Sequence, residues 1–333
     1  MSMPITIPTS MKAYLCVKPT ALASLALVET PMPVVPDDGV LVRVRASSAN
    51  PVDLFPTSFA GYLAGGREPV VLGTDFAGVV ESVGSAVTSY RPGDEVFGGG
   101  NGAFAEYICV RESRAVAIKP ASVSFEEAGV VAVAGCTALQ ALRDHGRLES
   151  GQRVLINGAS GGVGTFAVQI ARALGGHVTA VCSTRNVDMA RSLGAESVID
   201  YTQADFTRSD VRYDLVVDIA GSHPFVACSR VIAKGGAYVG VGAAGVQQRT
   251  AGTLRAFSHF LGARITSIGS DNRVVSLFIA SLKKDDIKFL GELMTDGRVK
   301  PVIDARYPLE QVPDALRQQE KFHARGKIAI AIA

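Results

Sequence analysis

Hydrophobic and polar positions alternate in short runs along the first third of the chain. In Val40–Ala46, Val and Leu interleave with Arg43 and Arg45, which is the period-two pattern of a strand with one buried face. Pro, Gly and Asp separate the runs, as turn residues do. This pattern predicts strands at Met11–Val17, Leu25–Thr30, Gly39–Ala46, Val71–Val83, Glu95–Phe97 and Ala103–Val110. No long amphipathic helix interrupts them, so the sequence predicts a separate, mostly antiparallel unit.

Helical spacing replaces this alternation near Ser124. Ser124 and Glu127 have the spacing of a capping box, and the apolar positions from Ser124 to Gly146 follow a helical period. Strands and helices then alternate, which predicts a parallel sheet covered by helices. The strands predicted for this sheet are Val154–Asn157, His177–Cys182, Ser197–Asp200, Tyr213–Ile219 and Ala237–Gly242.

The last stretch has mixed character. It contains a predicted helix at Asp285–Asp296, a second helix that begins near Pro313, and a terminal strand at Gly326–Ala333. With 333 residues the chain has about twice the usual length of one domain, which suggests two domains.

Composition narrows the class of protein. The chain is 47% hydrophobic and 19% charged, with a net charge of +2, which describes a compact globular protein with no bias toward nucleic acid. Its five cysteines are scattered without a CxxC pair, which argues against a disulfide framework and for a reducing, cytoplasmic location. No apolar run reaches membrane-spanning length, and the N-terminus lacks the pattern of a secretory signal.

A glycine-rich turn follows the first strand of the predicted parallel sheet. Val154–Gly164 reads VLINGASGGVG and leads into the helical pattern of Thr165–Leu174, with Ala159 where the first motif glycine is expected. Small residues at a strand-to-helix turn let backbone N–H groups approach a pyrophosphate at the positive end of the helix. The βαβ unit that this motif requires is present. We therefore expect dinucleotide contacts from Ser160, Gly161, Gly162, Val163 and Gly164; an ordinary glycine-rich turn is the alternative.

The end of the next strand bears on the type of nicotinamide cofactor. NAD sites place an Asp or Glu there, whereas this chain reads CSTRN after Val181. Ser183, Thr184 and Arg185 offer hydroxyl groups and a guanidinium to a 2′-phosphate. These residues predict NADPH in preference to NADH, unless Arg185 is only a solvated loop charge.

Eight segments, in order along the chain, resemble the medium-chain dehydrogenase/reductase superfamily, within it the zinc-independent quinone-oxidoreductase-like branch. They are ANPVD at 49–53, LGTDFAGVVESVGSAV at 72–87, RPGDEVFG at 91–98, GAFAEY at 102–107, AGCTALQAL at 134–142, NGASGGVG at 157–164, RSLGAESVIDY at 191–201 and HARGKIAI at 323–330. The resemblance implies an α/β fold: a GroES-like, β-rich catalytic domain (1–127 and 269–333) with an inserted Rossmann domain, a doubly wound parallel sheet, at 128–268.

The resemblance also implies further cofactor contacts. Tyr201 would lie near the 2′-phosphate, Thr137 on the nicotinamide side, and Gly242 after the strand that supports the ring. The segment Phe278–Ala280 would fold over the nicotinamide, so that Phe278 and Ala280 are candidates. Arg325 and Lys327 would close the site from the C-terminal strand. A packing or surface role is the alternative for each of these residues.

Zinc is not expected. Zinc-dependent relatives carry Cys where this chain has Asn50, and His-Glu where it has Thr74 and Asp75. Cys136 lies near the third ligand position, but one thiol does not supply the three protein ligands of catalytic zinc.

Without a metal, the acceptor must be polarised by hydrogen bonds, which suits quinones and α,β-unsaturated carbonyl compounds. Asn50 and Tyr62 are the candidates for contact with substrate and nicotinamide, and Asp53 is expected to fix the loop or Tyr62 rather than take a proton. A turn at Asn50-Pro51 and an exposed loop aromatic at Tyr62 are the alternatives. Phe55 and Phe59 suggest a small hydrophobic carbonyl or quinone substrate.

The sequence leaves two other functions open: an enoyl-thioester reductase, and a non-catalytic NADPH-binding regulatory or structural protein. The segment GARITSIG at 262–269 resembles the edge strand by which relatives pair, which implies a homodimer.

Overall fold

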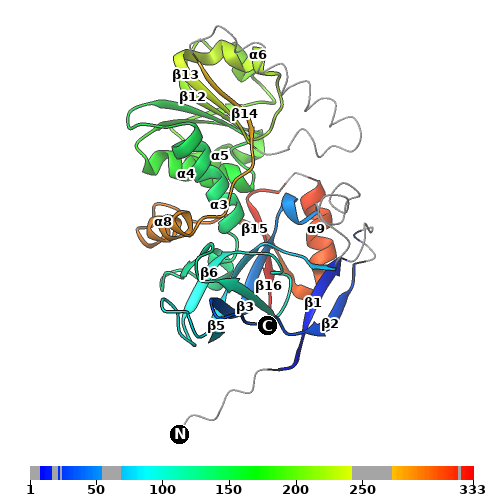
Figure 1. Ribbon diagram of the computed structural model, residues 1–333. Helices are drawn as coiled ribbons and strands as arrows, with labels where there is room; N and C mark the ends of the chain where they lie inside the picture. The colour runs from blue at the N-terminus through cyan, green and yellow to red at the C-terminus, as the bar shows by residue number, and fades with distance from the viewer. Residues whose placement is uncertain (1–7, 17–21, 23–24, 55–68, 242–271, 322–323) are drawn as a thin grey trace. The chain divides into compact units, whose positions relative to one another are not determined.

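The computed structural model describes residues 8–16, 22, 25–54, 69–241, 272–321 and 324–333 (Figure 1). The chain divides into two compact units. Unit 1 comprises Met1–Val133, Leu282–Thr295 and Ile303–Ala333, and unit 2 comprises Ala134–Ser281 and Asp296–Val302. Unit 1 therefore combines segments from both ends of the sequence.

Unit 1 is built on a seven-stranded sheet. Its strand order is β15 (Ile303–Pro308), β16 (Lys327–Ala331), β3 (Gly39–Ala49), β5 (Asp75–Val83), β6 (Glu95–Gly99) and β8 (Val116–Ile118), and β7 (Tyr107–Arg111) also pairs with β3. The pairs are antiparallel except for β15 with β16. A smaller sheet has the order β2 (Leu27–Pro31), β1 (Ser10–Cys16), β4 (Val70–Val71). The predicted antiparallel, GroES-like unit is confirmed.

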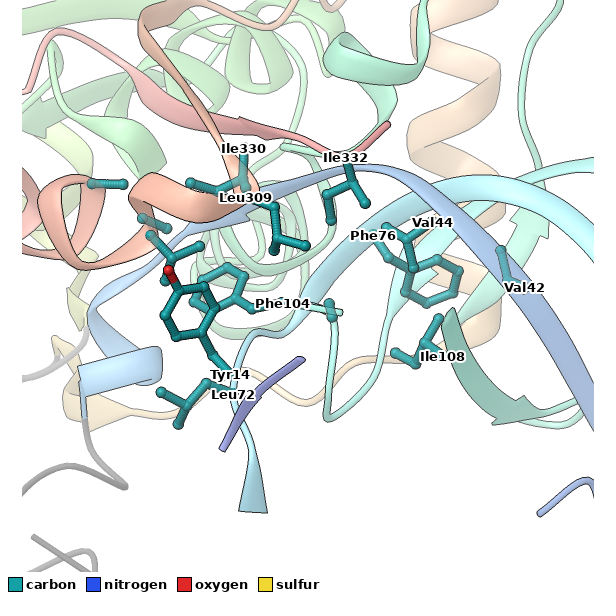
Figure 2. Close-up of a cluster of buried hydrophobic side chains, with 14 of the residues drawn as sticks. Tyr14, Val42, Val44, Leu72, Phe76, Phe104, Ile108, Leu309, Ile330 and Ile332 are labelled. Carbon is teal, nitrogen blue, oxygen red and sulfur yellow. The ribbon is translucent and has the colours of Figure 1, made fainter. Parts of the chain in front are cut away.

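The apolar positions of β3 contribute to the core of this unit, and Leu41 between Val40 and Val42 is buried as well. Val40, Val42 and Val44 on β3 are fully buried, whereas the intervening Arg43 is partly exposed. Figure 2 shows part of the resulting cluster, in which Phe76 and Phe104 lie among aliphatic side chains. The other cluster members labelled there are Tyr14, Leu72, Ile108, Leu309, Ile330 and Ile332.

The predicted helix from Ser124 to Gly146 is wrong as one element. The capping box is confirmed, because Ser124 and Glu127 bond reciprocally, but α2 (Phe125–Ala128) ends at Gly129. A Cβ on Gly129 would lie 2.9 Å from the backbone of Ala46, so this residue packs directly on β3 at the end of the helix. A new helix, α3 (Ala132–Leu139), follows and continues as the π-helix η3 (Gln140–His145).

Further short elements complete unit 1. The predicted helix near residue 285 is α8 (Lys284–Thr295), and the helix near Pro313 is α9 (Val312–Glu320), with Pro in its first turn. The turn η2 (Pro51–Leu54) follows β3, and the turn η7 (Leu309–Gln311) leads into α9.

Unit 2 is a six-stranded, wholly parallel sheet, as the alternating pattern predicts. Its order is β11 (Ser197–Asp200), β10 (His177–Cys182), β9 (Arg153–Asn157), β12 (Tyr213–Asp218), β13 (Ile232–Val241) and β14 (Arg273–Phe278). The connecting helices are α4 (Gly162–Ala173), α5 (Val187–Ser192) and α6 (Phe225–Cys228), with short turns η4 (Thr184–Asn186), η5 (Phe206–Arg208) and η6 (Ser229–Val231). This is the strand order of a Rossmann sheet, whose ligands bind at the carboxyl ends of the strands.

Two bulk expectations can be compared with the structure. None of the five cysteines forms a disulfide, in agreement with the prediction of no disulfide framework. Across the part of the chain that the structure describes, no helix is both long and apolar enough to cross a membrane.

Candidate functional site

A network of buried polar side chains lies where three neighbouring strands of unit 1 meet. Ser48 and Asn50 stand at the end of β3, Asp75 begins β5, and Lys327 begins β16. Because β3 lies between β5 and β16, the register places Ser48 opposite Asp75 and Ala49 opposite Ile328. All four polar residues are buried, so each must find partners within the protein.

Asp75 accepts hydrogen bonds from every side of this network. Its Oδ2 accepts from Ser48 Oγ at 2.6 Å, from Asn50 Nδ2 at 3.1 Å and from Lys327 Nζ at 3.3 Å. Its Oδ1 accepts from the backbone N–H of Val133 at 2.7 Å. The buried carboxylate and the buried ammonium thus form an ion pair supported by neutral donors.

Asn50 links the two charged groups. Its Oδ1 accepts from Lys327 Nζ, and its Nδ2 donates to Asp75 and also to Ser48 O at 3.2 Å. The side-chain amide is therefore engaged at both ends with buried partners. The hydrogen bonds place Asn50 between Lys327 and Asp75. Its contact with a substrate stays a prediction.

Asp53 lies one turn further along, in η2, and is only 2% exposed. Its Oδ2 accepts from the backbone N–H of Asn50 at 2.7 Å, and its Oδ1 accepts from the Thr74 hydroxyl at 2.7 Å. The pKa of Asp53 is raised from 3.8 to about 7, mainly by burial; the Thr74 hydrogen bond lowers it and the nearby Asp75 carboxylate raises it within that net shift. Asp53 therefore exchanges a proton near neutral pH.

In unit 2 the glycine-rich segment has the geometry of an anion-binding loop. It connects β9 to α4, whose N-cap is Gly161. A Cβ on Gly164 would lie 2.1 Å from Gly158 O, so only glycine allows the first turn of the helix to pack on the loop. A Cβ on Gly161 would meet nothing closer than 3.7 Å, which leaves space beside the helix N-terminus. The first-turn N–H groups of α4 have no intrahelical acceptors and can bind a phosphate there.

The first glycine of the loop lies one residue earlier than the sequence predicts. The left-handed conformation belongs to Gly158, with φ of +87°, whereas Ala159 is fully buried. The tight turn out of β9 therefore depends on Gly158, a residue missing from the predicted set. The Asn157-Gly158 dipeptide, a common turn signal, could have identified it.

The residues predicted to select NADPH lie at the end of β10. Ser183 is partly exposed, and Thr184 and Arg185 in η4 are exposed. The register of the parallel sheet places Asp200, the last residue of β11, opposite Cys182. Asp200 Oδ2 accepts from the Thr184 hydroxyl at 2.6 Å. The sequence at the end of β10 alone gives no sign of this carboxylate.

The remaining predicted cofactor residues fall in both units. Tyr201 follows β11 and is 60% exposed, and Thr137 is a partly exposed residue of α3. Phe278 ends β14, where its ring lies 4.4 Å from that of His145, and Ala280 follows it. Arg325 is exposed just before β16 in unit 1.

Several predicted residues lie outside the described part of the chain. They are Tyr62 with its neighbours Phe55 and Phe59, Gly242, and the segment 262–269. Their roles stay predictions.

Comparison with known proteins assigns the family. The model described as "Alcohol dehydrogenase GroES-like domain" matches residues 36–121, and the one described as "Zinc-binding dehydrogenase" matches residues 193–330. The chloroplast envelope quinone oxidoreductase homolog of Arabidopsis thaliana is 33% identical over 331 residues, which cover 92% of this chain and 94% of that protein. The chain belongs to the medium-chain dehydrogenase/reductase superfamily, with quinone-oxidoreductase-like relatives.

Two further comparisons cover nearly the whole chain. The trans-enoyl reductase pgmF of Aspergillus terreus is 36% identical over 361 residues, covering 98% of each chain. The solved structure of the quinone oxidoreductase from Coxiella burnetii superposes with a TM-score of 0.84 at 28% identity, covering 97% of this chain and all of that one. This superfamily member is thus an oxidoreductase of an NAD(P)H-dependent family.

The name of the matching dehydrogenase family implies zinc, but the residues present do not fit that metal. Where a catalytic site needs three ligands, this network offers an amide, a hydroxyl and one carboxylate, and the Lys327 ammonium already bonds to both Asn50 and Asp75. A second cation among these groups would face electrostatic repulsion from Lys327. Among the residues with described positions, no group of three or more His, Cys, Asp or Glu side chains could hold a metal ion.

Proposed function

We propose that the protein is an NADPH-dependent, zinc-independent oxidoreductase that transfers a hydride to a quinone or an α,β-unsaturated carbonyl compound. The observation that carries the proposal is the Lys327 ammonium, which bonds to Asn50 and Asp75 where zinc-dependent relatives hold their metal. Acceptor activation would then rest on hydrogen bonds. Quinones and conjugated carbonyls suit such a site, because the charge formed by hydride addition spreads onto a distant oxygen.

NADPH would supply the hydride when bound. The contribution of the chain is to hold it in place. The open space at Gly161 and the N-terminus of α4 suit the pyrophosphate, with Ser160, Gly162, Val163 and Gly164 completing the loop. The residues proposed for the 2′-phosphate are Ser183, Thr184, Arg185 and Tyr201. Those proposed along the nicotinamide half are Thr137, Gly242, Phe278, Ala280, Arg325 and Lys327.

Reduction of a quinone or an enone also consumes a proton. With a pKa of about 7, Asp53 holds a proton in about half of the molecules at neutral pH. The partly buried Thr74 hydroxyl donates to Asp53 Oδ1 and lies beside this buried carboxyl. Beyond the loop-fixing role expected from the sequence, we propose Asp53 as a proton reserve on the basis of its raised pKa, beside Asn50 and Tyr62 as the groups near the acceptor. The apolar character of the 55–63 segment favours a hydrophobic acceptor.

A second candidate is an enoyl-thioester reductase, which is favoured by the identity with a relative named trans-enoyl reductase. The two can be separated by one assay. Oxidation of NADPH would be measured with quinones, enals, enones and acyl thioesters, with and without a metal chelator. We expect the highest kcat/KM with a quinone or an enone, and no effect of the chelator.

Three other outcomes of that assay would contradict the proposed function. Thioesters as the best acceptors would replace the proposed function by the second candidate. Loss of activity with the chelator would contradict zinc independence. NADPH binding without oxidation by any acceptor would favour a regulatory or structural NADPH-binding protein.

The preference for NADPH is tested by Arg185→Ala. Removal of a guanidinium that binds the 2′-phosphate should weaken NADPH binding about tenfold to a hundredfold and leave NADH binding unchanged. The matched control is Arg208→Ala, because Arg208 is exposed in the same unit and pairs with Asp205. An unchanged ratio of the two dissociation constants in Arg185→Ala would contradict the assignment.

We also propose a homodimer in a reducing compartment such as the cytoplasm. The predicted pairing segment at 262–269 precedes β14, which ends the described sheet of unit 2. Light scattering coupled to size exclusion should give twice the chain mass of 34.8 kDa. A mass of one chain would contradict the dimer.

A further inference from the structure

The Asp200 carboxylate is held at the end of β11 by hydrogen bonds to both of its oxygens. Oδ2 accepts from the Thr184 hydroxyl at 2.6 Å and from Gln203 Nε2 at 3.0 Å. Oδ1 accepts from the backbone N–H of Thr202 at 3.0 Å and from the Thr202 hydroxyl at 2.8 Å. Asp200 is thus fixed beside the residues proposed to bind the 2′-phosphate.

The same contacts decide which hydroxyl groups can donate to a phosphate. A threonine hydroxyl has one hydrogen, and that of Thr184 points to Asp200. Ser183 differs, because its Oγ accepts from Asn186 Nδ2 at 3.1 Å and so keeps its own hydrogen for another acceptor. Of these two adjacent hydroxyls, only that of Ser183 is arranged to donate to a phosphate.

The charge of Asp200 acts in the same direction. The hydrogen bond from Thr184 and those from Thr202 hold the pKa of Asp200 below its ordinary range, so the carboxylate is ionised at neutral pH. A phosphate in contact with Thr184 or Arg185 would lie within a Debye length of this negative charge. Two anionic groups at this separation repel each other, and NADH has no phosphate at that position.

We propose that Asp200 is a specificity-determining residue that weakens binding of the 2′-phosphate and thereby keeps NADH competitive with NADPH. The inference rests on the proposed function, since it presumes that the 2′-phosphate binds at Ser183–Arg185. It adds that two strand ends set the affinity for NADPH: the residues after β10 attract the 2′-phosphate, and Asp200 at the end of β11 repels it.

The test compares Asp200→Asn with the wild-type protein. The new amide oxygen can still accept from the Thr202 N–H, and the amide nitrogen can donate to Thr184 Oγ, which releases the threonine hydrogen; the exposed Gln203 amide can turn its oxygen toward that nitrogen. Dissociation constants of NADPH and NADH would be measured by titration calorimetry at low and at high salt. We expect about threefold to tenfold tighter NADPH binding at low salt, a smaller gain at high salt, and NADH binding unchanged.

Asp205→Asn is the matched control. Asp205 has the same local arrangement, because its Oδ1 accepts from the Thr207 N–H at 2.9 Å and from the Thr207 hydroxyl at 2.7 Å. It faces Arg208 and His223 instead of Thr184. The control removes the same charge from the same unit, so it should leave the ratio of NADPH to NADH affinity as in the wild type.

The outcomes separate this inference from the proposed function. Failure of the wild type to bind NADPH, or equal NADPH binding by Arg185→Ala, would overturn the proposed cofactor site. If that site holds and Asp200→Asn leaves the cofactor ratio unchanged or shifts it toward NADH, the role of Asp200 is overturned. Asp200→Ser, which keeps an acceptor for the Thr202 N–H, decides the question if the first variant does not fold.

Discussion

Asp53→Asn should remove the loss of stability that ionisation of the buried Asp53 carboxyl causes as the pH rises. The folded protein holds the Asp53 proton with a pKa of about 7, against 3.8 in an unfolded chain, and burial is the main cause. A raised pKa favours the folded state while the group is protonated, and this advantage is lost as the pH rises through the interval from about 4 to about 7. The wild-type protein is therefore expected to become less stable toward alkaline pH through this one residue.

The size of the effect follows from the two pKa values. One pKa unit corresponds to about 1.4 kcal/mol, so the full loss is about 4 kcal/mol. Between about pH 5 and about pH 8, the Asp53 carboxyl is almost fully ionised in the unfolded chain, whereas in the folded protein it becomes ionised only at the upper end of this range. Integration over this window gives a loss of about 2.5 kcal/mol in the free energy of unfolding.

The variant keeps the geometry while it removes the charge. The oxygen of the new side-chain amide can accept from the backbone N–H of Asn50, as the Asp53 carboxylate does. The amide nitrogen can donate to Thr74 Oγ, since the threonine hydroxyl can rotate to point elsewhere. The comparison therefore isolates ionisation from the loss of hydrogen bonds.

The assay is urea unfolding followed by circular dichroism at both pH values for wild type and variant. The free energy lost between about pH 5 and about pH 8 should be about 2.5 kcal/mol smaller in Asp53→Asn, because all other groups titrate equally in both proteins. Asp205→Asn is the control: hydrogen bonds from Thr207 lower the pKa of Asp205, so its contribution is lost only as the pH falls below this window. Equal losses in wild type and Asp53→Asn would refute the reasoning.

Two further predictions concern the glycine loop and the buried ion pair. Gly164→Ala should lower the free energy of unfolding by about 1–3 kcal/mol, because its Cβ would overlap Gly158 O. Gly161→Ala should unfold like the wild type but bind NADPH at least about tenfold more weakly, because its methyl group occupies the open space at the helix N-terminus. Equal stability of the two variants would contradict this reasoning. Lys327→Met should cost about 3–5 kcal/mol in urea unfolding, because it leaves the Asp75 carboxylate buried without its cation, and a cost under about 1 kcal/mol would show that the pair is not needed.

The parts of the fold that depend on local patterns could be predicted from the sequence. Alternation in Val40–Ala46 identified a strand, although β3 is largely buried on both faces, and the spacing of Ser124 and Glu127 identified a helix start. The order of strands and helices after residue 150 identified the parallel sheet. In each case the signal lies within one element or between consecutive elements.

The errors arose where distant segments meet. The helix that begins at Ser124 looks continuous in sequence, but Gly129 packs on Ala46 of β3, and nothing near Gly129 announces that contact. The network around Asp75 likewise joins segments that are distant in the sequence. The predicted cofactor role of Lys327 stays a prediction, but its hydrogen bond to Asn50 depends on the pairing of β16 with β3, which no local pattern announces.

Cofactor selection shows the same limit most clearly. The sequence rule examines the residue at the end of the second strand of the sheet, where this chain has no carboxylate, and so predicts NADPH. In a parallel sheet, however, the carboxyl ends of neighbouring strands converge on one edge, and the register places Asp200 opposite Cys182. A ligand at that edge responds to the sum of both strand ends. The preference between NADPH and NADH should therefore follow the net charge of the Ser183–Arg185 and Asp200 positions together, which single and double substitutions of Arg185 and Asp200 would resolve.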